Sequence, residues 1–208
     1  MKNFILSIAL AGMVIIAGAG KTYAQKSQTR VGIKAGLSLT TLGAATANGV
    51  SINYDYRPGF QGGVFLEAPL SSSITFSPQV LFTQKGGNVN TTINGINIKG
   101  NTQLNYIDVP LLVGFKANPN LAFYVGPQAS FLLSQKDVIT SGPSTATNTS
   151  TTGTRKTNFG GNLGAGYKFN DNVSLNVNYI FDFSHAAEGN YDNGERNSGF
   201  LFTVGYLF

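Results

Sequence analysis

The chain has 208 residues, of which only 11% are charged and 12% are aromatic, and its formal net charge is +5. This length suits one domain or two small ones, and the low charge with the high aromatic content excludes a disordered chain. The sequence has no cysteine and a single histidine, His185. These counts exclude a disulfide scaffold, a cysteine nucleophile and a multi-histidine metal site, so we expect no metal and no cofactor.

The first 24 residues have the features of a secretory signal peptide. Lys2 supplies a positive charge, residues 4–20 contain no charged residue, and Ala24 ends a small-residue cleavage pattern. A transmembrane helix is the alternative, but glycine, alanine and serine residues dilute the apolar run. We expect cleavage after Ala24, which makes residues 25–208 the mature domain. Its net charge of about +3, after loss of Lys2 and Lys21, gives no indication of a nucleic-acid partner.

The mature chain repeats a two-residue alternation of apolar and polar side chains and shows no sustained helical period. This pattern predicts eight strands. They lie near residues 30–40, 59–68, 73–85, 102–116, 120–134, 157–169, 172–183 and 197–208.

The connections between these strands alternate in length. Short turns at 69–72, 117–119 and 170–171 contain proline, asparagine or aspartate. The other connections are the long polar segments 41–58, 86–101, 135–156 and 184–196. Alternating short turns and long loops predict an all-β fold, an eight-stranded antiparallel up-and-down transmembrane barrel.

The two faces of the predicted strands differ in polarity. One face is apolar and uncharged, whereas the other carries amides, charges and many glycines. A soluble secreted β-barrel would show the same alternation and is a minor alternative. Small and polar residues suit the narrow interior of a transmembrane barrel, with lipid against the apolar face. The predicted interior charges are Lys34, Glu67, Asp108, Lys168 and Asp182.

Two residue types within the predicted strands lead to further expectations. Pro78, Pro110 and Pro127 lack the backbone N–H that a ladder needs, so we expect bulges or rim positions there. Phenylalanines near strand ends predict aromatic girdles at the two membrane interfaces. They are Phe115, Phe159, Phe169, Phe183, Phe200 and Phe208.

Two segments carry a family resemblance. The last strand, Phe200-Leu-Phe-Thr-Val-Gly-Tyr-Leu-Phe208, resembles the C-terminal signature of outer-membrane proteins, with Phe202, Val204, Tyr206 and Phe208 on one face. The run Leu104-Asn-Tyr-Ile-Asp-Val-Pro-Leu-Leu-Val-Gly-Phe-Lys116 is similar to a motif of the outer-membrane β-barrel family common in Bacteroidota, which includes the PorT-like proteins. The resemblance implies the barrel fold, export to the outer membrane and recognition by the barrel-assembly machinery. It implies no catalytic residues.

Three functional classes compete. We expect a non-catalytic protein with a structural, adhesive or surface-interaction role, whose interior charges form a polar plug. A narrow porin-like channel lined by those charges is the alternative. Catalysis is not expected, because Asp182, Ser184 and His185 lie too close along one strand to converge as a triad.

The long loops are the candidate contact sites for an unknown surface ligand or partner protein. Tyr54, Tyr56, Arg57 and Tyr191 combine aromatic and charged groups, as recognition loops often do. The alternative is that these loops are merely polar because they are exposed. Residues 140–154 are of low complexity, and we expect them to be mobile.

Overall fold

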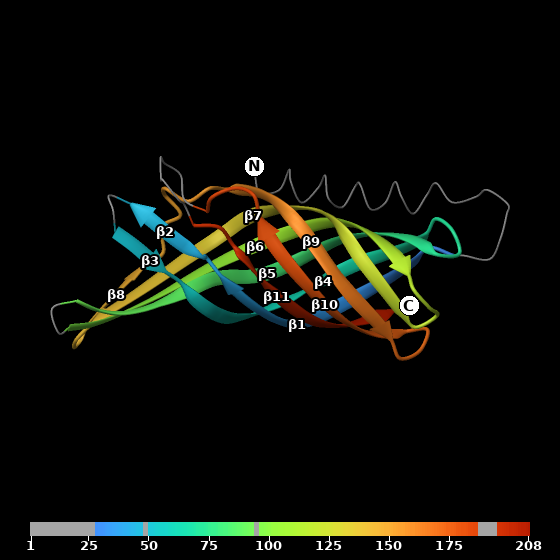
Figure 1. Ribbon diagram of the computed structural model, residues 1–208, viewed down its shortest axis with the longest axis horizontal. Helices are drawn as coiled ribbons and strands as arrows, with labels where there is room; N and C mark the ends of the chain where they lie inside the picture. The colour runs from blue at the N-terminus through green and yellow to red at the C-terminus, as the bar shows by residue number, and fades with distance from the viewer. Residues whose placement is uncertain (1–27, 48–49, 94–95, 187–194) are drawn as a thin grey trace.

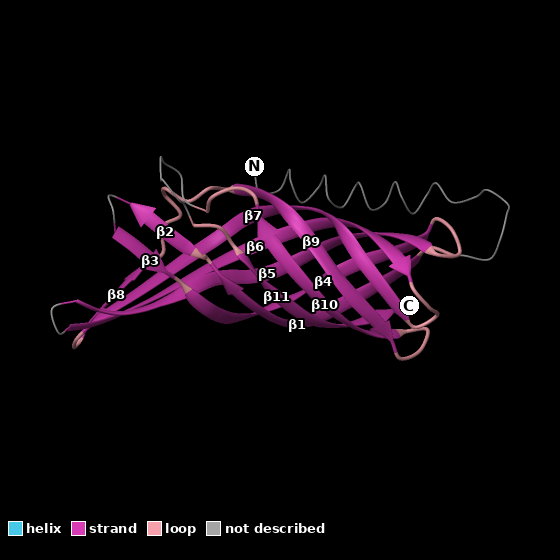
Figure 2. Ribbon diagram, viewed as in Figure 1, coloured by secondary structure: helices cyan, strands magenta, loops and turns pink. Residues whose placement is uncertain are grey.

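The computed structural model describes residues 28–47, 50–93, 96–186 and 195–208, which form strands joined by turns and loops (Figures 1 and 2). The predicted signal peptide lies outside the described residues. Among those described, no helix is long and apolar enough to span a membrane.

Eight strands form a closed antiparallel ring in the order β1-β4-β5-β6-β7-β9-β10-β11, and β11 pairs back onto β1. This ring confirms the predicted eight-stranded up-and-down barrel, and closure leaves no open edge around the barrel wall. The ring strands are β1 (Arg30–Thr41), β4 (Asp55–Pro69), β5 (Ile74–Ile93), β6 (Ile96–Lys116), β7 (Leu121–Ser141), β9 (Thr157–Lys168), β10 (Val173–Asp182) and β11 (Ser198–Leu207).

The apolar face of the barrel points outward and the polar face points inward. Phe123 and Val204 are about half exposed, whereas Gln61, Thr83 and Asn158 are buried. A soluble barrel would bury the apolar face, so this orientation is that of a barrel in lipid. The six phenylalanines of the predicted girdles are all at least 40% exposed.

Glycines on neighbouring strands make room for two aromatic rings inside the barrel. A Cβ added at Gly32 would lie 2.6 Å from the Phe65 ring, and one added at Gly114 would lie 2.7 Å from the Tyr124 ring. The inward-facing glycines therefore let large side chains fill an interior that is only wide enough for side chains.

The strands on one side of the ring continue far beyond the others. β5, β6 and β7 have 20, 21 and 21 residues, while β10 and β11 have 10 each. β8 (Ser144–Asn148) pairs with the end of β7, and the hairpin β2 (Ala44–Ala47) and β3 (Val50–Asn53) lies at the same end of the barrel (Figure 1). We call residues 86–93, 96–105 and 134–141 together with β8 the loop-side sheet.

The loop-side sheet corrects the prediction of two long loops. Residues 86–93 and 96–101 form the paired ends of β5 and β6, and segment 135–156 contains the end of β7 and β8. One face of this sheet carries Val89, Ile98 and Ile139 among polar residues, whereas the other face carries amides and lysines. The many asparagines, threonines and glycines in these segments are typical of loops, which is why the sequence predicts loops there. The low-complexity segment 140–154 contains β8, so part of it is paired strand.

The three strand prolines do not lie at bulges. The pairing register is the same on both sides of Pro78, Pro110 and Pro127, although the ladders skip residue pairs beside Pro78 and Pro110. The register shifts instead between Tyr56 and Gln61 and between Asn105 and Tyr106. The expectation of bulges or rim positions at the prolines was therefore wrong, since each proline is accommodated in a continuous strand.

Candidate functional site

The barrel interior holds two groups of charged residues, and the first lies toward the long strand ends. The Lys85 ammonium is 3.2 Å from Asp108 Oδ1 and 3.9 Å from Asp182 Oδ1, and it donates a hydrogen bond to Ser130 Oγ at 3.0 Å. It also lies 4.9 Å from the centre of the Tyr106 ring. We call Lys85, Asp108, Asp182 and Tyr106 the loop-side cluster.

Amide side chains complete the loop-side cluster. Asn197 donates to Asp182 Oδ2 at 3.1 Å, and Asn158 donates to the Tyr106 hydroxyl at 3.2 Å. Lys85, Tyr106 and both asparagines are completely buried. One ammonium group lies between two carboxylates, so this cluster carries a formal charge of −1 and closes the bore on that side.

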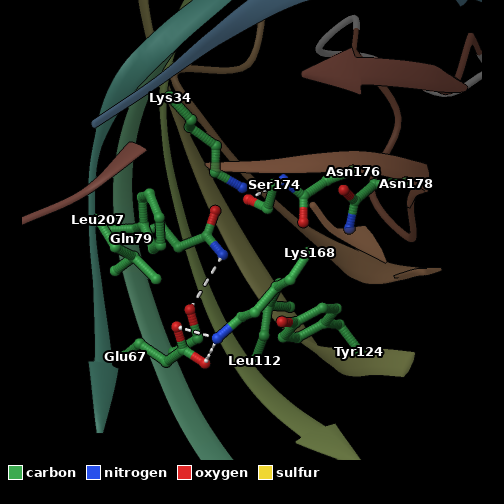
Figure 3. Close-up of a pocket in the computed structure, with 12 residues that line it drawn as sticks. Lys34, Glu67, Gln79, Leu112, Tyr124, Lys168, Ser174, Asn176, Asn178 and Leu207 are labelled. Carbon is green, nitrogen blue, oxygen red and sulfur yellow. Dashed lines mark hydrogen bonds and ion pairs between the residues drawn. The ribbon is translucent and has the colours of Figure 1, made fainter. Parts of the chain in front are cut away.

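The second group, drawn in Figure 3, lies toward the short turns, because Glu67 and Lys168 also line a space bounded by turn residues such as Asn118. Lys168 donates to both carboxylate oxygens of Glu67, at 2.7 and 2.9 Å. Together with Lys34 they form the turn-side cluster, whose formal charge is +1. Glu67 on β4 and Lys168 on β9 belong to strands four places apart in the eight-strand ring, so their ion pair crosses the bore.

Two spaces meet at the Glu67–Lys168 pair. A small inner cavity of about 20 Å³ is lined by Lys34, Glu67 and Lys168, among others. A vestibule of about 180 Å³ at the turn-side rim is lined by Glu67, Lys168 and Tyr124 together with Lys116 and turn residues. The ion pair and Tyr124 border both spaces and form the wall between them.

The structure places the five predicted interior charges in the bore and adds a sixth. Sequence reasoning missed Lys85, which stood at the last position of the predicted strand 73–85. The odd-numbered inward residues of that strand, Thr75, Ser77, Gln79 and Thr83, gave the signal, because the same alternation turns Lys85 inward.

The residues that could suggest a catalytic triad do not form one. Asp182 is held by Lys85 and Asn197, while the His185 ring contacts Arg196 Nη2 at 3.1 Å. Ser184 Oγ accepts from the backbone N–H of Phe159. Within the described ranges, no three His, Cys, Asp or Glu residues are grouped closely enough to hold a metal ion.

The predicted loop contacts lie at the base of the loop-side sheet. Tyr56 is half exposed, and the Tyr54 hydroxyl donates to Glu195 Oε1 at 2.5 Å. Arg57 donates to Gln103 Oε1 at 2.7 Å and to Asn101 Oδ1 at 3.4 Å. Tyr191 lies outside the described residues.

One face of the loop-side sheet is basic and rich in amides. Arg57 contacts its Asn101 and Gln103, and the exposed Lys99 and Lys136 follow the same alternation on neighbouring strands. A shallow groove of about 370 Å³ crosses the sheet. It is lined by Asn88, Val89, Asn90, Lys99, Gly100, Asn101, Val138 and Thr140.

The final strand presents its apolar row to the outside. The side chains of this row are between 43% and 66% exposed, on the outer face of β11 and at the residue that follows it: Phe202, Val204, Tyr206 and Phe208. Arg30 stabilises this end of the barrel, because its guanidinium donates hydrogen bonds to the backbone oxygens of Leu207, the last residue of β11, and of Phe208, the residue after it.

The outward apolar face and the polar interior are those of a β-barrel that lies in a lipid bilayer. Comparison of the chain with known proteins leads to the same class. The chain matches the family model of the outer membrane protein β-barrel domain over residues 23–188. The chain therefore belongs to this family and lies in the bacterial outer membrane. In such barrels the short turns face the periplasm and the longer connections face the outside, which places the loop-side sheet at the cell surface.

Several solved structures are similar to this chain. Ail, the attachment invasion locus protein of Yersinia pestis, is 14% identical with a TM-score of 0.50 over 88% of this chain and 100% of that chain. For Ail in complex with the heparin analogue sucrose octasulfate, the sequence identity is 15% and the TM-score is 0.51, with the same coverage of both chains. For Neisserial surface protein A, the sequence identity is 16% and the TM-score is 0.49, again over 88% of this chain and 100% of that chain. No curated protein matches the chain.

Proposed function

We propose that this protein is a non-catalytic surface-interaction protein whose barrel anchors the loop-side sheet at the outer face of the membrane. The observation that carries the proposal is the length of β5, β6 and β7. A tilted strand needs about 9–11 residues to cross the bilayer. The remaining ten or so residues of each strand extend about 30 Å farther at roughly 3.3 Å per residue.

The chemistry of the loop-side sheet favours a polyanionic ligand, such as a sulfated polysaccharide. Its outer face carries Lys99 and Lys136, and Arg57 at the start of β4 contacts the same face. One exposed carboxylate, Asp55 on β4, lies in register with this face. Amide side chains beside these cations supply further hydrogen-bond donors. The fold relative Ail was solved with a heparin analogue, which supports testing the same ligand class here.

The test is retention of the detergent-solubilised protein on immobilised heparin. The combined variant Arg57→Gln, Lys99→Gln and Lys136→Gln should elute at clearly lower salt than the wild type, because three cations are lost from one face. Lys116→Gln, at the opposite end of the barrel, is the matched control and should elute unchanged. Equal retention of the triple variant and the wild type would contradict the proposed contact face.

A narrow porin-like channel is the alternative function, and the turn-side vestibule is the observation that favours it. The loop-side cluster opposes it, because completely buried side chains fill the bore above the vestibule. We therefore expect no single-channel steps from the wild-type protein in a lipid bilayer, with folding verified by heat-dependent gel mobility. Reproducible steps that change in Glu67→Gln or Lys34→Met would establish the channel instead.

Export and assembly complete the proposal. We propose that residues 1–24 are removed as a signal peptide, so that residues 25–208 form the barrel domain, and N-terminal sequencing of the membrane protein should begin at Gln25. The outward row Phe202, Val204, Tyr206 and Phe208 supports recognition by the barrel-assembly machinery. The resemblance of the run from Leu104 to Lys116 supports a place in the PorT-like group of Bacteroidota.

A further inference from the structure

Lys34 is a buried cation without a partner in the part of the chain that the structure describes. It is only 7% exposed, and no described oxygen accepts a hydrogen bond or forms an ion pair with its ammonium group. Its one described interaction is with the Phe65 ring, whose centre lies 5.5 Å away. An uncompensated buried charge is costly, and a single distant ring offsets little of that cost.

Glu67, the carboxylate that lines this cavity, does not pair with Lys34. Both oxygens of Glu67 accept from Lys168, and in Figure 3 the Lys34 ammonium lies on the Ser174 side of the cavity, away from that pair. The lining of the cavity therefore keeps a formal charge of +1.

The neutral side chains around Lys34 also have donors to spare. Ser77 Oγ accepts from Gln79, and Ser174 Oγ accepts from Asn176. A hydroxyl that accepts in this way still has its own hydrogen to donate. Two hydroxyl hydrogens and the three ammonium hydrogens are thus available at the cavity wall.

We propose that the inner cavity is a binding site for a single monatomic halide, chloride in the natural setting, held by Lys34 with the hydroxyls of Ser77 and Ser174. The cavity volume of about 20 Å³ accommodates a particle of about the size of a water molecule, and a halide ion is close to that size. One negative charge neutralises the turn-side cluster, which a water molecule does not do. The halide reaches the site from the turn-side vestibule past the Glu67–Lys168 pair.

The direct test is diffraction from crystals of the wild-type protein soaked in sodium bromide and measured at the bromine absorption edge. We expect an anomalous peak in hydrogen-bonding contact with Lys34 Nζ. Absence of such a peak in well-ordered crystals would overturn the proposal, since bromide is a close substitute for chloride.

The second test is thermal unfolding of the detergent-solubilised protein in sodium chloride against sodium gluconate, whose anion is too large for the cavity. Chloride at ten times its dissociation constant should raise the Tm by about 3–6 °C over gluconate. Lys34→Met should lose this difference, whereas Lys156→Met, which removes an exposed lysine outside both clusters and the loop-side sheet, should keep it. The same chloride effect in Lys34→Met as in the wild type would overturn the site, and if Lys34→Met does not fold the bromide experiment decides.

Discussion

The loop-side and turn-side clusters each contain three charged residues, but they differ in their access to water and in the sign of their imbalance. In the loop-side cluster Lys85 and Asp108 are completely buried, and two carboxylates share one ammonium group. In the turn-side cluster the Lys168 side chain is 25% exposed, and two ammonium groups share one carboxylate. The comparison shows that one barrel interior holds two kinds of charged cluster. The loop-side cluster is buried and held by neighbouring side chains, whereas the Glu67–Lys168 pair is partly exposed beside a cavity.

The largest effect should come from breaking the dry cluster. Among the described residues, Lys85 is the only cation that pairs with Asp108 and Asp182, so in Lys85→Met two buried carboxylates lose their compensation. We expect a loss of about 3–5 kcal/mol in the free energy of unfolding, measured by urea titration in detergent.

A neutral version of the cluster provides the control for Lys85→Met. Adding Asp108→Asn and Asp182→Asn removes the uncompensated charges, so most of the lost stability should return. A loss below about 1 kcal/mol in Lys85→Met would mean that the loop-side cluster is not dry.

A smaller effect should come from filling the glycine space beneath Tyr124. A Cβ at Gly114 would lie 2.7 Å from the Tyr124 ring, so Gly114→Ala displaces the side chain that separates the vestibule from the inner cavity. We expect a loss of about 1–3 kcal/mol in unfolding free energy. Gly100→Ala on the same strand is the control, because its Cβ would make an ordinary contact of 3.5 Å with Val89, and equal losses in both would refute the packing argument.

The smallest effect should come from the turn-side pair. Glu67→Gln leaves Lys168 without its carboxylate, but Lys168 is partly exposed toward the vestibule, so water replaces part of the interaction. We expect a loss of about 1 kcal/mol, measured by the same urea titration. Asp171→Asn, an exposed acid in the adjacent turn, should have no measurable effect. A loss for Glu67→Gln as large as that for Lys85→Met would remove the distinction between the two clusters.

The sequence predicted the features that depend on alternation. The ring of eight strands, the inward position of Lys34 and Asp108 and the outward row of β11 all follow from a two-residue period. The same period did not identify the loop-side sheet, because asparagine, threonine, serine and glycine are frequent in its segments and indicate loops. Its strands are recognised only from pairing between β5, β6 and β7, which is a tertiary property.

The sequence could also not predict which of the interior charges form ion pairs with one another. Glu67 and Lys168 are 101 residues apart, and their meeting depends on the stagger of the strands around the ring. The same limit applies to Lys85. Alternation predicts that its side chain points inward, but it does not identify Asp108 and Asp182 as its partners. The cavity beside Lys34 depends on the positions of twelve lining residues at once.

The ion pairs that cross the bore have a consequence for the order of folding. Glu67 and Lys168 lie on opposite walls, as do Lys85 on β5 and Asp182 on β10, which are also four places apart in the ring. No hairpin brings such partners together, so they meet only once β1 and β11 have joined the two ends of the ring. Loss of either pair should therefore speed the unfolding of the finished barrel and leave its rate of insertion into the membrane almost unchanged.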